Sequence, residues 1–390
     1  MELNHSQLER FLIMSAEKSP VLVLSQPGIG KSYKVKQAHS KLAAKQGRQF
    51  KEWNRLAFEE KLELIKNAKY IKDTYIFCDV RLSQWDAGDF AIPDMSDKSF
   101  YQKKSPMMFA ALSQPEASGV FFADELPNAL PIVQAAAQQL FLDGAVGEVT
   151  LSPKVSRVAA GNRGCDRCNV FELSAATCNR FGHVELVKPT VDSWLTEFAY
   201  RNGIDERISS FLLSMPDRLT ATDAEVKDSK NLAFPSPRAW TNASELAMGT
   251  NDADAFLAVA AWCGEGTARQ FKGYLDVVGK IDIRELMANP DAVLSRYANG
   301  GDGQILYGMI SAVTSAVNDD AKRIQDGLGV VVSFQKHKKH EWANALFQSL
   351  MFSSSIRKKT TKERVGMVCV DPEKRKSLEG MMKFLVDTED

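Results

Sequence analysis

LSQPGIGKS, residues 24–32, is the stretch on which the fold prediction depends. It follows the apolar run 20–24 and precedes a helical pattern that extends to about Lys45. This order is typical of the phosphate-binding loop G-x-x-x-x-G-K-[ST], with Ser25 in place of the first glycine. Consecutive backbone N–H groups at such a helix N-terminus bind anions, although an ordinary strand–turn–helix corner is the alternative. The residues expected to bind the phosphate groups are Gln26, Pro27, Gly28, Ile29, Gly30, Lys31 and Ser32.

Composition places the 390-residue chain among ordinary globular proteins and predicts two or three domains. Lys and Arg together balance Asp and Glu at 49 each, so no overall charge draws the chain to nucleic acid or an anionic membrane. We expect no membrane partner, because no apolar run approaches about 20 residues. Six cysteines in a chain of this length do not indicate a disulfide framework, so we expect a reducing, cytoplasmic setting.

The first half of the chain alternates apolar strand-like runs with helical patterns. We expect strands at 20–24, 75–82, 119–125, 155–160 and 183–187, and helices at 4–17, 31–45, 53–70, 130–142 and 172–180. Strands that alternate with helices predict an α/β fold, a three-layer αβα core around a parallel five-stranded sheet.

After Pro189 the pattern becomes helical, with helices expected at 191–202, 205–214, 237–248, 252–263, 304–318, 341–353 and 374–387. The apolar run 329–333 is ambiguous between strand and helix. We therefore divide the chain into a nucleotide-binding core at 1–189, with an insertion at about 83–107, a helical lid at 190–298 and a C-terminal helical extension at 299–390.

Two carboxylates end the strand at 119–125. Asp124 is placed to hold Mg²⁺ together with Ser32, and Glu125 is placed to polarise a water molecule that attacks phosphate. A solvated acidic turn is the alternative. The acidic pair comes about 90 residues after the phosphate-binding motif, and the two motifs support each other.

Three further polar residues are candidates for the same chemistry. Asn162 ends the fourth strand, where an amide can orient the attacking water, although Gly-Asn is also a common turn. Arg180 ends a helix; its planar guanidinium suits the charge that develops on phosphate, and the alternative is that it satisfies the last helix carbonyls. Arg238 lies in the first turn of a helix, where a cation opposes the helix dipole and so hints at an anionic partner.

The ordered motifs of the chain resemble the AAA+ ATPases of the MoxR type over roughly residues 5–250. The motifs are PGIGKS at 27–32, RLSQWDAGDFAIP at 81–93, GVFFADELPNALPIVQAAAQQLFLDG at 119–144, VAAGNR at 158–163, NRFGHVEL at 179–186 and SPRAW at 236–240. The resemblance implies a five-stranded core, a helical lid and a ring, usually a hexamer, with ATP and Mg²⁺ between subunits. It also implies ATP-dependent remodelling of a protein client, commonly together with a von Willebrand A domain protein.

The resemblance also implies a role for each matching residue. Residues 28–32 match Walker A, and Asp124 and Glu125 match Walker B. Asn162 matches sensor 1, Arg180 matches the arginine finger that reaches a neighbouring subunit, and Arg238 matches sensor 2. The second expectation, from another class, is a nucleotide-gated switch that binds DNA or RNA through the basic clusters at 336–340 and 357–362.

Two other groups have both a functional and a structural interpretation. Trp85, Phe90 and Ile92 of the insertion are candidates for gripping a client, or they pack the insertion onto its own core. Cys165, Cys168, Cys178 and His183 could be misread as a zinc site. Their spacing matches no common zinc motif, and Cys178 and His183 fall on expected core elements, so we do not expect one.

Overall fold

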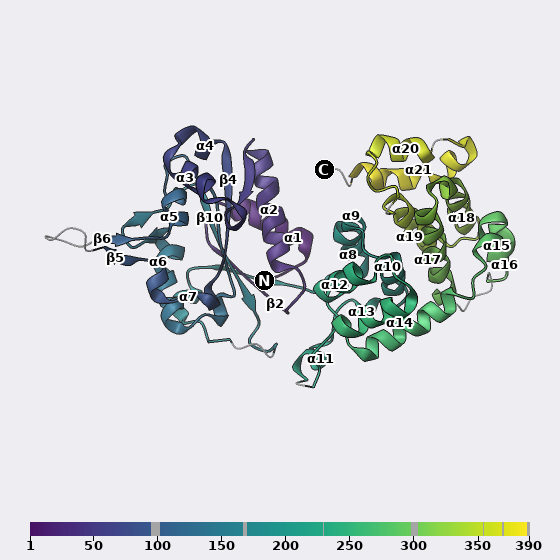
Figure 1. Ribbon diagram of the computed structural model, residues 1–390, viewed down its shortest axis with the longest axis horizontal. Helices are drawn as coiled ribbons and strands as arrows, with labels where there is room; N and C mark the ends of the chain where they lie inside the picture. Colours follow the sequence, from purple (N-terminus) through teal and green to yellow (C-terminus); the bar gives the residue numbers. More distant parts are fainter. Residues whose placement is uncertain are drawn as a thin grey trace. The chain divides into compact units, whose positions relative to one another are not determined.

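The computed structural model describes residues 1–94, 102–166, 170–228, 230–297, 303–353, 355–368 and 370–387. The chain forms two compact units, Met1–Pro189 and Thr190–Asp390, which are described separately (Figure 1). The predicted boundary between lid and C-terminal extension, at 298/299, lies outside the described residues.

The first unit is built on a seven-stranded parallel sheet in the order β1-β11-β2-β10-β7-β4-β3. Its strands are β1 (Glu2–Leu3), β2 (Val21–Ser25), β3 (Gln49–Glu52), β4 (Thr74–Arg81), β7 (Ser118–Asp124), β10 (Val155–Asn162) and β11 (Gly182–Leu186). The α/β class with a parallel sheet is confirmed. The five predicted strands occupy the middle, and β1 and β3 extend the sheet at its two edges.

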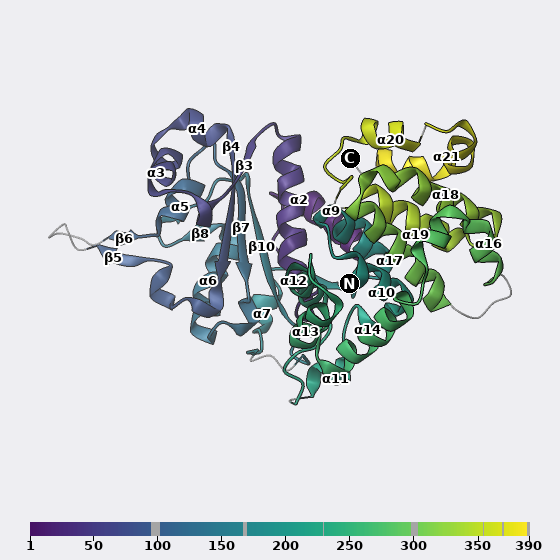
Figure 2. The same ribbon diagram turned by 45° about the vertical axis from the view of Figure 1, so that its right-hand side comes forward.

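Helices cover both faces of this sheet, because successive strand side chains point to opposite faces. On β7, Val120 and Phe122 pack into a core with helices α1 (His5–Ser15) and α2 (Lys31–Lys45). Phe121 and Ala123 pack into a second core on the other face. That core includes α3 (Phe58–Lys66), α4 (Ala68–Lys72), α5 (Met107–Leu112) and α6 (Pro131–Asp143). Figure 2 shows α2 and α6 on opposite sides of the sheet.

Two predicted helices of the first unit are shorter or broken. The expected helix at 53–70 is a 3₁₀ turn at Trp53–Arg55 followed by α3 and α4, and the side chain of Asn67 caps α4 where α3 ends. The expected helix at 172–180 is only α7 (Ala175–Cys178). Two small antiparallel hairpins complete the described part of the unit: β5 (Ile92–Asp94) with β6 (Gln102–Lys104), and β8 (Ala145–Val146) with β9 (Val149–Thr150).

The second unit is helical. Its helices are α8 (Val191–Trp194), α9 (Tyr200–Asn202), α10 (Glu206–Ser214), α11 (Asp223–Lys227), α12 (Pro237–Ala247), α13 (Asp252–Cys263), α14 (Glu265–Val278), α15 (Ile283–Ala288), α16 (Pro290–Ser295), α17 (Gly303–Asp319), α18 (Ile324–Lys336), α19 (His340–Met351), α20 (Thr361–Val368) and α21 (Pro372–Asp387). One hydrophobic core joins these helices except α11, with Phe211, Trp240 and Phe271 fully buried. The ambiguous run 329–333 belongs to α18. In the described ranges, no helix combines the length and apolar character that a membrane crossing needs.

Candidate functional site

The phosphate-binding motif forms a loop between the inner strand β2 and helix α2. Ser25 ends β2 opposite Asn162 of β10, and Lys31 begins α2. Gly28 and Gly30 have φ angles of 80° and 101°, which glycine adopts at little cost and other residues rarely adopt. The loop therefore turns its backbone at the N-terminus of a 15-residue helix, where N–H groups and the helix dipole favour an anion.

Lys31 folds back over this loop instead of extending into solvent. Its side-chain Nζ donates to the backbone carbonyl oxygens of Ser25 and Gln26, each at 3.3 Å, and to Ser25 Oγ at 2.9 Å. It also donates to Oδ1 of Asn162 at 3.0 Å. Only 8% of Lys31 is exposed. The buried serine at position 25 thus positions the lysine through its hydroxyl, a contact that the usual glycine cannot make.

The carboxylates at the end of β7 lie next to this loop. Ser32 Oγ donates to Oδ2 of Asp124 at 2.7 Å, although the two residues are 92 positions apart. Glu125 follows in the left-handed region with φ of 61°, and its own N–H donates to Oδ1 of Asp124 at 2.9 Å. The Ser83 hydroxyl donates to the Glu125 carboxylate. The unusual backbone of Glu125 therefore sends its side chain in a different direction from Asp124.

A third carboxylate adds to the negative charge near the carboxyl ends of these strands. Asp79 lies on the neighbouring strand β4, where burial, followed by the charge of Asp124, raises its pKa above the ordinary value. Its Oδ1 has no hydrogen-bond partner within the described part of the chain. Sequence reasoning missed Asp79, which belongs to no recognisable motif. It assigned no role to Ser83, although Ser83 lies within the motif at 81–93.

The residues present fit Mg²⁺ better than a transition metal. Ser32 and Asp124 supply two oxygen ligands beside the loop, and Mg²⁺ commonly uses one or two protein oxygens together with water and substrate phosphates. Among the described residues, no group of three or more His, Cys, Asp or Glu is placed to hold a metal ion by itself. The donor set therefore suits a hard cation that arrives with a phosphate ligand.

Asn162 lies at the site because β10 pairs with β2, where Asn162 is opposite Ser25. The residue before it, Gly161, packs closely against η4, the 3₁₀ turn Leu126–Asn128 after β7. A Cβ atom at Gly161 would lie 2.2 Å from Cδ of Pro127, so only glycine fits there without movement. Oδ1 of Asn162 accepts a hydrogen bond from Lys31 Nζ at 3.0 Å, so the residue lies beside the loop. Its role in orienting water remains a prediction.

Arg180 follows α7 and has a local contact in the described chain. Its guanidinium donates to the carbonyl oxygen of Ala176, four residues earlier, as the structural alternative expected. Within the described residues its Nε has no hydrogen-bond partner. A role in a neighbouring subunit's site stays a prediction.

Arg238 belongs to the second unit. It is exposed in the first turn of α12, directly after the helix cap that Ser236 forms with the N–H of Ala239. This location agrees with the expected position in a helix, and its function as sensor 2 stays a prediction.

One residue at the loop had no sequence signal. The His5 side chain at the start of α1 has its Nε2 2.8 Å from the carbonyl oxygen of Ile29, inside the loop. The first helix thereby helps to fix the backbone of the phosphate-binding loop. Nothing in the spacing of the N-terminal residues indicates this contact.

The aromatic residues of the insertion follow the packing alternative. Phe90 is 5% exposed and lies in the second core, and its ring centroid is 5.0 Å from that of Trp85. Trp85 also meets Phe109 edge-on at 6.4 Å. Trp85 and Phe90 therefore pack the insertion onto the sheet unit. Ile92 is part of β5.

The contacts of the cysteines and the histidine named above give a zinc site no support. Cys165 and Cys178 are free thiols, and His183 Nε2 lies 2.8 Å from the carbonyl oxygen of Cys178. Cys168 lies outside the described residues.

The basic cluster at 336–340 has partners within the second unit. Lys336 pairs with Asp291 at 3.3 Å, and Lys339 lies over the ring of Trp342. These contacts give the nucleic-acid alternative no additional support.

Comparisons with known proteins find distant structural likeness only. No family model and no curated protein matches the sequence. A putative ATPase from Cytophaga hutchinsonii is 14% identical, covers 66% of this chain and 76% of its own, and has a TM-score of 0.31. A RuvB variant from Thermotoga maritima is 14% identical; the match covers 80% of this chain and 84% of the RuvB chain, with a TM-score of 0.29. A second variant of that RuvB is also 14% identical; the match covers 81% of this chain and 82% of the RuvB chain, with a TM-score of 0.29. TM-scores of this size do not assign an activity to the chain.

Proposed function

We propose that the chain is a Mg²⁺-dependent ATPase that converts ATP and water to ADP and phosphate. The observation that carries the proposal is the meeting of two distant motifs: the Ser32 hydroxyl lies 2.7 Å from the Asp124 carboxylate beside a glycine-shaped loop at a helix N-terminus. This combination of an anion-binding backbone, a buried lysine and a hard-cation donor pair favours a nucleotide polyphosphate.

The roles of the residues follow from their chemistry. Lys31 and the loop N–H groups bind the phosphates, and Ser32 and Asp124 hold Mg²⁺. When bound, Mg²⁺ supplies positive charge that offsets the phosphate oxygens. Glu125 accepts a proton from the attacking water, and the Asn162 amide aligns that water.

We further propose a MoxR-type AAA+ protein that forms a cytoplasmic ring, a hexamer in the commonest arrangement, and remodels a protein client or complex. This part rests on the sequence resemblance. Arg180 then stabilises the developing phosphate charge in the neighbouring subunit, and Arg238 contacts the γ-phosphate from the lid. A von Willebrand A domain protein is the partner class that the resemblance suggests.

Glu125→Gln tests the hydrolytic role. The variant keeps the size and polarity of the side chain but cannot accept a proton, so ATP binding should persist while turnover falls by about 10²–10⁴-fold. Glu148→Gln, an exposed acid in the β8–β9 hairpin, is the matched control and should behave as wild type. Normal turnover by Glu125→Gln would reject the assignment.

Arg180→Ala tests the role between subunits. Each subunit should still bind ATP, and turnover should be lost because the group that stabilises the transition state is missing. Arg201→Ala, an exposed arginine of the second unit, is the control. Mixing Arg180→Ala with Glu125→Gln subunits should restore part of the activity, since some interfaces then combine an intact Glu125 with an intact Arg180. Full activity of Arg180→Ala alone contradicts the proposal.

A further inference from the structure

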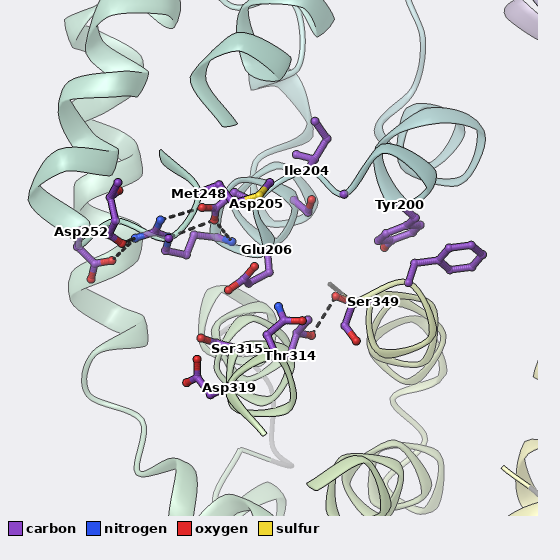
Figure 3. Close-up of a pocket in the computed structure, with 18 residues that line it drawn as sticks. Tyr200, Ile204, Asp205, Glu206, Met248, Asp252, Thr314, Ser315, Asp319 and Ser349 are labelled. Carbon is purple, nitrogen blue, oxygen red and sulfur yellow. Dashed lines mark hydrogen bonds and ion pairs between the residues drawn. The ribbon is translucent and has the colours of Figure 1, made fainter. Parts of the chain in front are cut away.

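The helical unit contains a cavity that the proposed ATPase chemistry does not use. Its volume is about 570 Å³, within the usual range for small-molecule sites. The wall comes from several elements: α9 and the turn after it, the first turns of α10 and α13, the turn after α12, and the last parts of α17 and α19. Figure 3 shows side chains from these helices converging on the cavity.

The charged residues that line the cavity are predominantly acidic. Asp205, Glu206, Asp252 and Asp319 line it, and among the described lining residues Arg207 is the single basic one. Two further guanidinium groups contact lining residues: Arg357 contacts Gly203, and Arg364 lies over the ring of Phe352. Even with both included, carboxylates outnumber guanidinium groups by one.

Arg207 is already engaged with two of these carboxylates. Its Nη2 lies 2.7 Å from Asp205 Oδ2, and its Nη1 lies 3.0 Å from Asp252 Oδ1. Glu206 and Asp319 have no such ion pair in the described chain, and Asp319 is exposed. Burial, followed by the charge of Asp205, raises the pKa of Glu206. An incoming cation would therefore relieve an unfavourable negative charge at Glu206.

A buried hydroxyl gives an independent indication of a ligand. Ser209 lines the cavity and is only 4% exposed, yet its Oγ has no hydrogen-bond partner in the part of the chain that is described. Such a group carries a desolvation cost of about 1–3 kcal/mol until something pairs with it. Across the cavity, the hydroxyls of Thr314 and Ser349 lie 2.9 Å apart and offer further hydrogen bonds.

The remaining wall is apolar. Tyr200 and Phe352 stack with ring centroids 6.0 Å apart, and Ile204 and Met248 also line the cavity. Aromatic faces attract cations and also cover aliphatic chains. A bare metal ion would not use these surfaces, and the described residues provide no cluster of metal ligands here.

We propose that this cavity binds a small organic cation, an ammonium or guanidinium group on a short aliphatic chain, with Glu206 as the charged partner and Ser209 as a hydrogen-bonding partner. The cationic head pairs with the Glu206 carboxylate, and the chain lies along Tyr200 and Phe352. This site is separate from the nucleotide chemistry and does not depend on it.

Isothermal titration of the full chain with n-pentylammonium tests the proposal, with 1-pentanol as the neutral analogue and MgCl₂ as the inorganic cation. We expect one equivalent of n-pentylammonium to bind, with at least tenfold weaker binding of 1-pentanol. No binding, equal binding of the alcohol within threefold, or displacement of the amine by equimolar Mg²⁺ would overturn the proposal.

Variants locate the site. Glu206→Gln should weaken n-pentylammonium binding at least tenfold, a loss of about 1.4 kcal/mol. Glu245→Gln, an exposed acid of α12 outside the cavity, should change it less than twofold. Asp319→Asn, at an exposed position where folding is not at risk, should weaken binding at least threefold and decides the matter if Glu206→Gln does not fold. Unchanged affinity in the folded cavity variants refutes the assignment.

Discussion

Replacing Lys31 with methionine separates nucleotide binding from folding. Methionine keeps an unbranched side chain, one atom shorter than that of lysine, and removes the ammonium. In the wild-type chain this ammonium donates to oxygen atoms of Ser25, Gln26 and Asn162. Those oxygens lose a donor, so the free energy of unfolding should fall by about 1–3 kcal/mol. A loss of this size leaves a typical domain folded.

The effect on ATP should be larger in relative terms. A hydrogen bond to a charged group contributes about 1.5–3 kcal/mol, and each 1.4 kcal/mol is a factor of ten. Lys31→Met should therefore bind Mg·ATP about 10- to 150-fold more weakly in a calorimetric titration. Lys45→Met, at the exposed last turn of the same helix, is the control and should match wild type. Wild-type affinity within threefold, in a variant that circular dichroism shows to be folded, would refute the placement of the phosphates at this loop.

Three other changes test neighbouring features. Asn162→Asp puts a carboxylate 3.0 Å from the lysine amine, so it should compete with phosphate and weaken ATP binding roughly tenfold by titration. Gly161→Ala should lower the free energy of unfolding in urea by about 1–3 kcal/mol, because the new Cβ overlaps a proline ring, whereas Gly164→Ala has open space and should change it by less than about 0.5 kcal/mol. Burial lowers the pKa of His39 from 6.5 to about 3, so below pH 6.5 the unfolded chain binds a proton that the folded chain does not. The free energy of unfolding, measured by urea titration, should therefore fall by about 1.4 kcal/mol between pH 7.5 and 5.5. His39→Gln should abolish this loss, whereas the control variant His340→Gln, at an exposed position, should still show it.

Local patterns were enough to predict the inner strands of the sheet and the position of the loop. Apolar runs bounded by turn residues identified the five inner strands, because strands buried on both faces carry continuous apolar sequence. The spacing of residues 28–32 and 124–125 correctly placed Ser32 beside Asp124. The edge strands were missed because Glu2–Leu3 is too short for a pattern and Gln49–Glu52 is polar and partly exposed.

Other features depend on tertiary context. The run 329–333 is β-branched but lies within a helix, where Val330 and Val331 are buried against neighbouring helices. His5 contacts the loop, and Ser83 contacts Glu125, only because the folded chain brings distant segments together. The cavity in the helical unit is lined by residues between 200 and 353, so no local stretch of sequence predicts it.

The separation of the hydrophobic cores has a thermodynamic consequence. The two cores around the sheet draw on residues 8–186, and the helical core draws on residues 191–385. Each half of the polypeptide thus buries its own apolar surface, and exposing one core to water does not by itself expose the other. Heating should consequently produce two cooperative unfolding transitions, one for each unit. A single melting temperature would then average the melting temperatures of the two units.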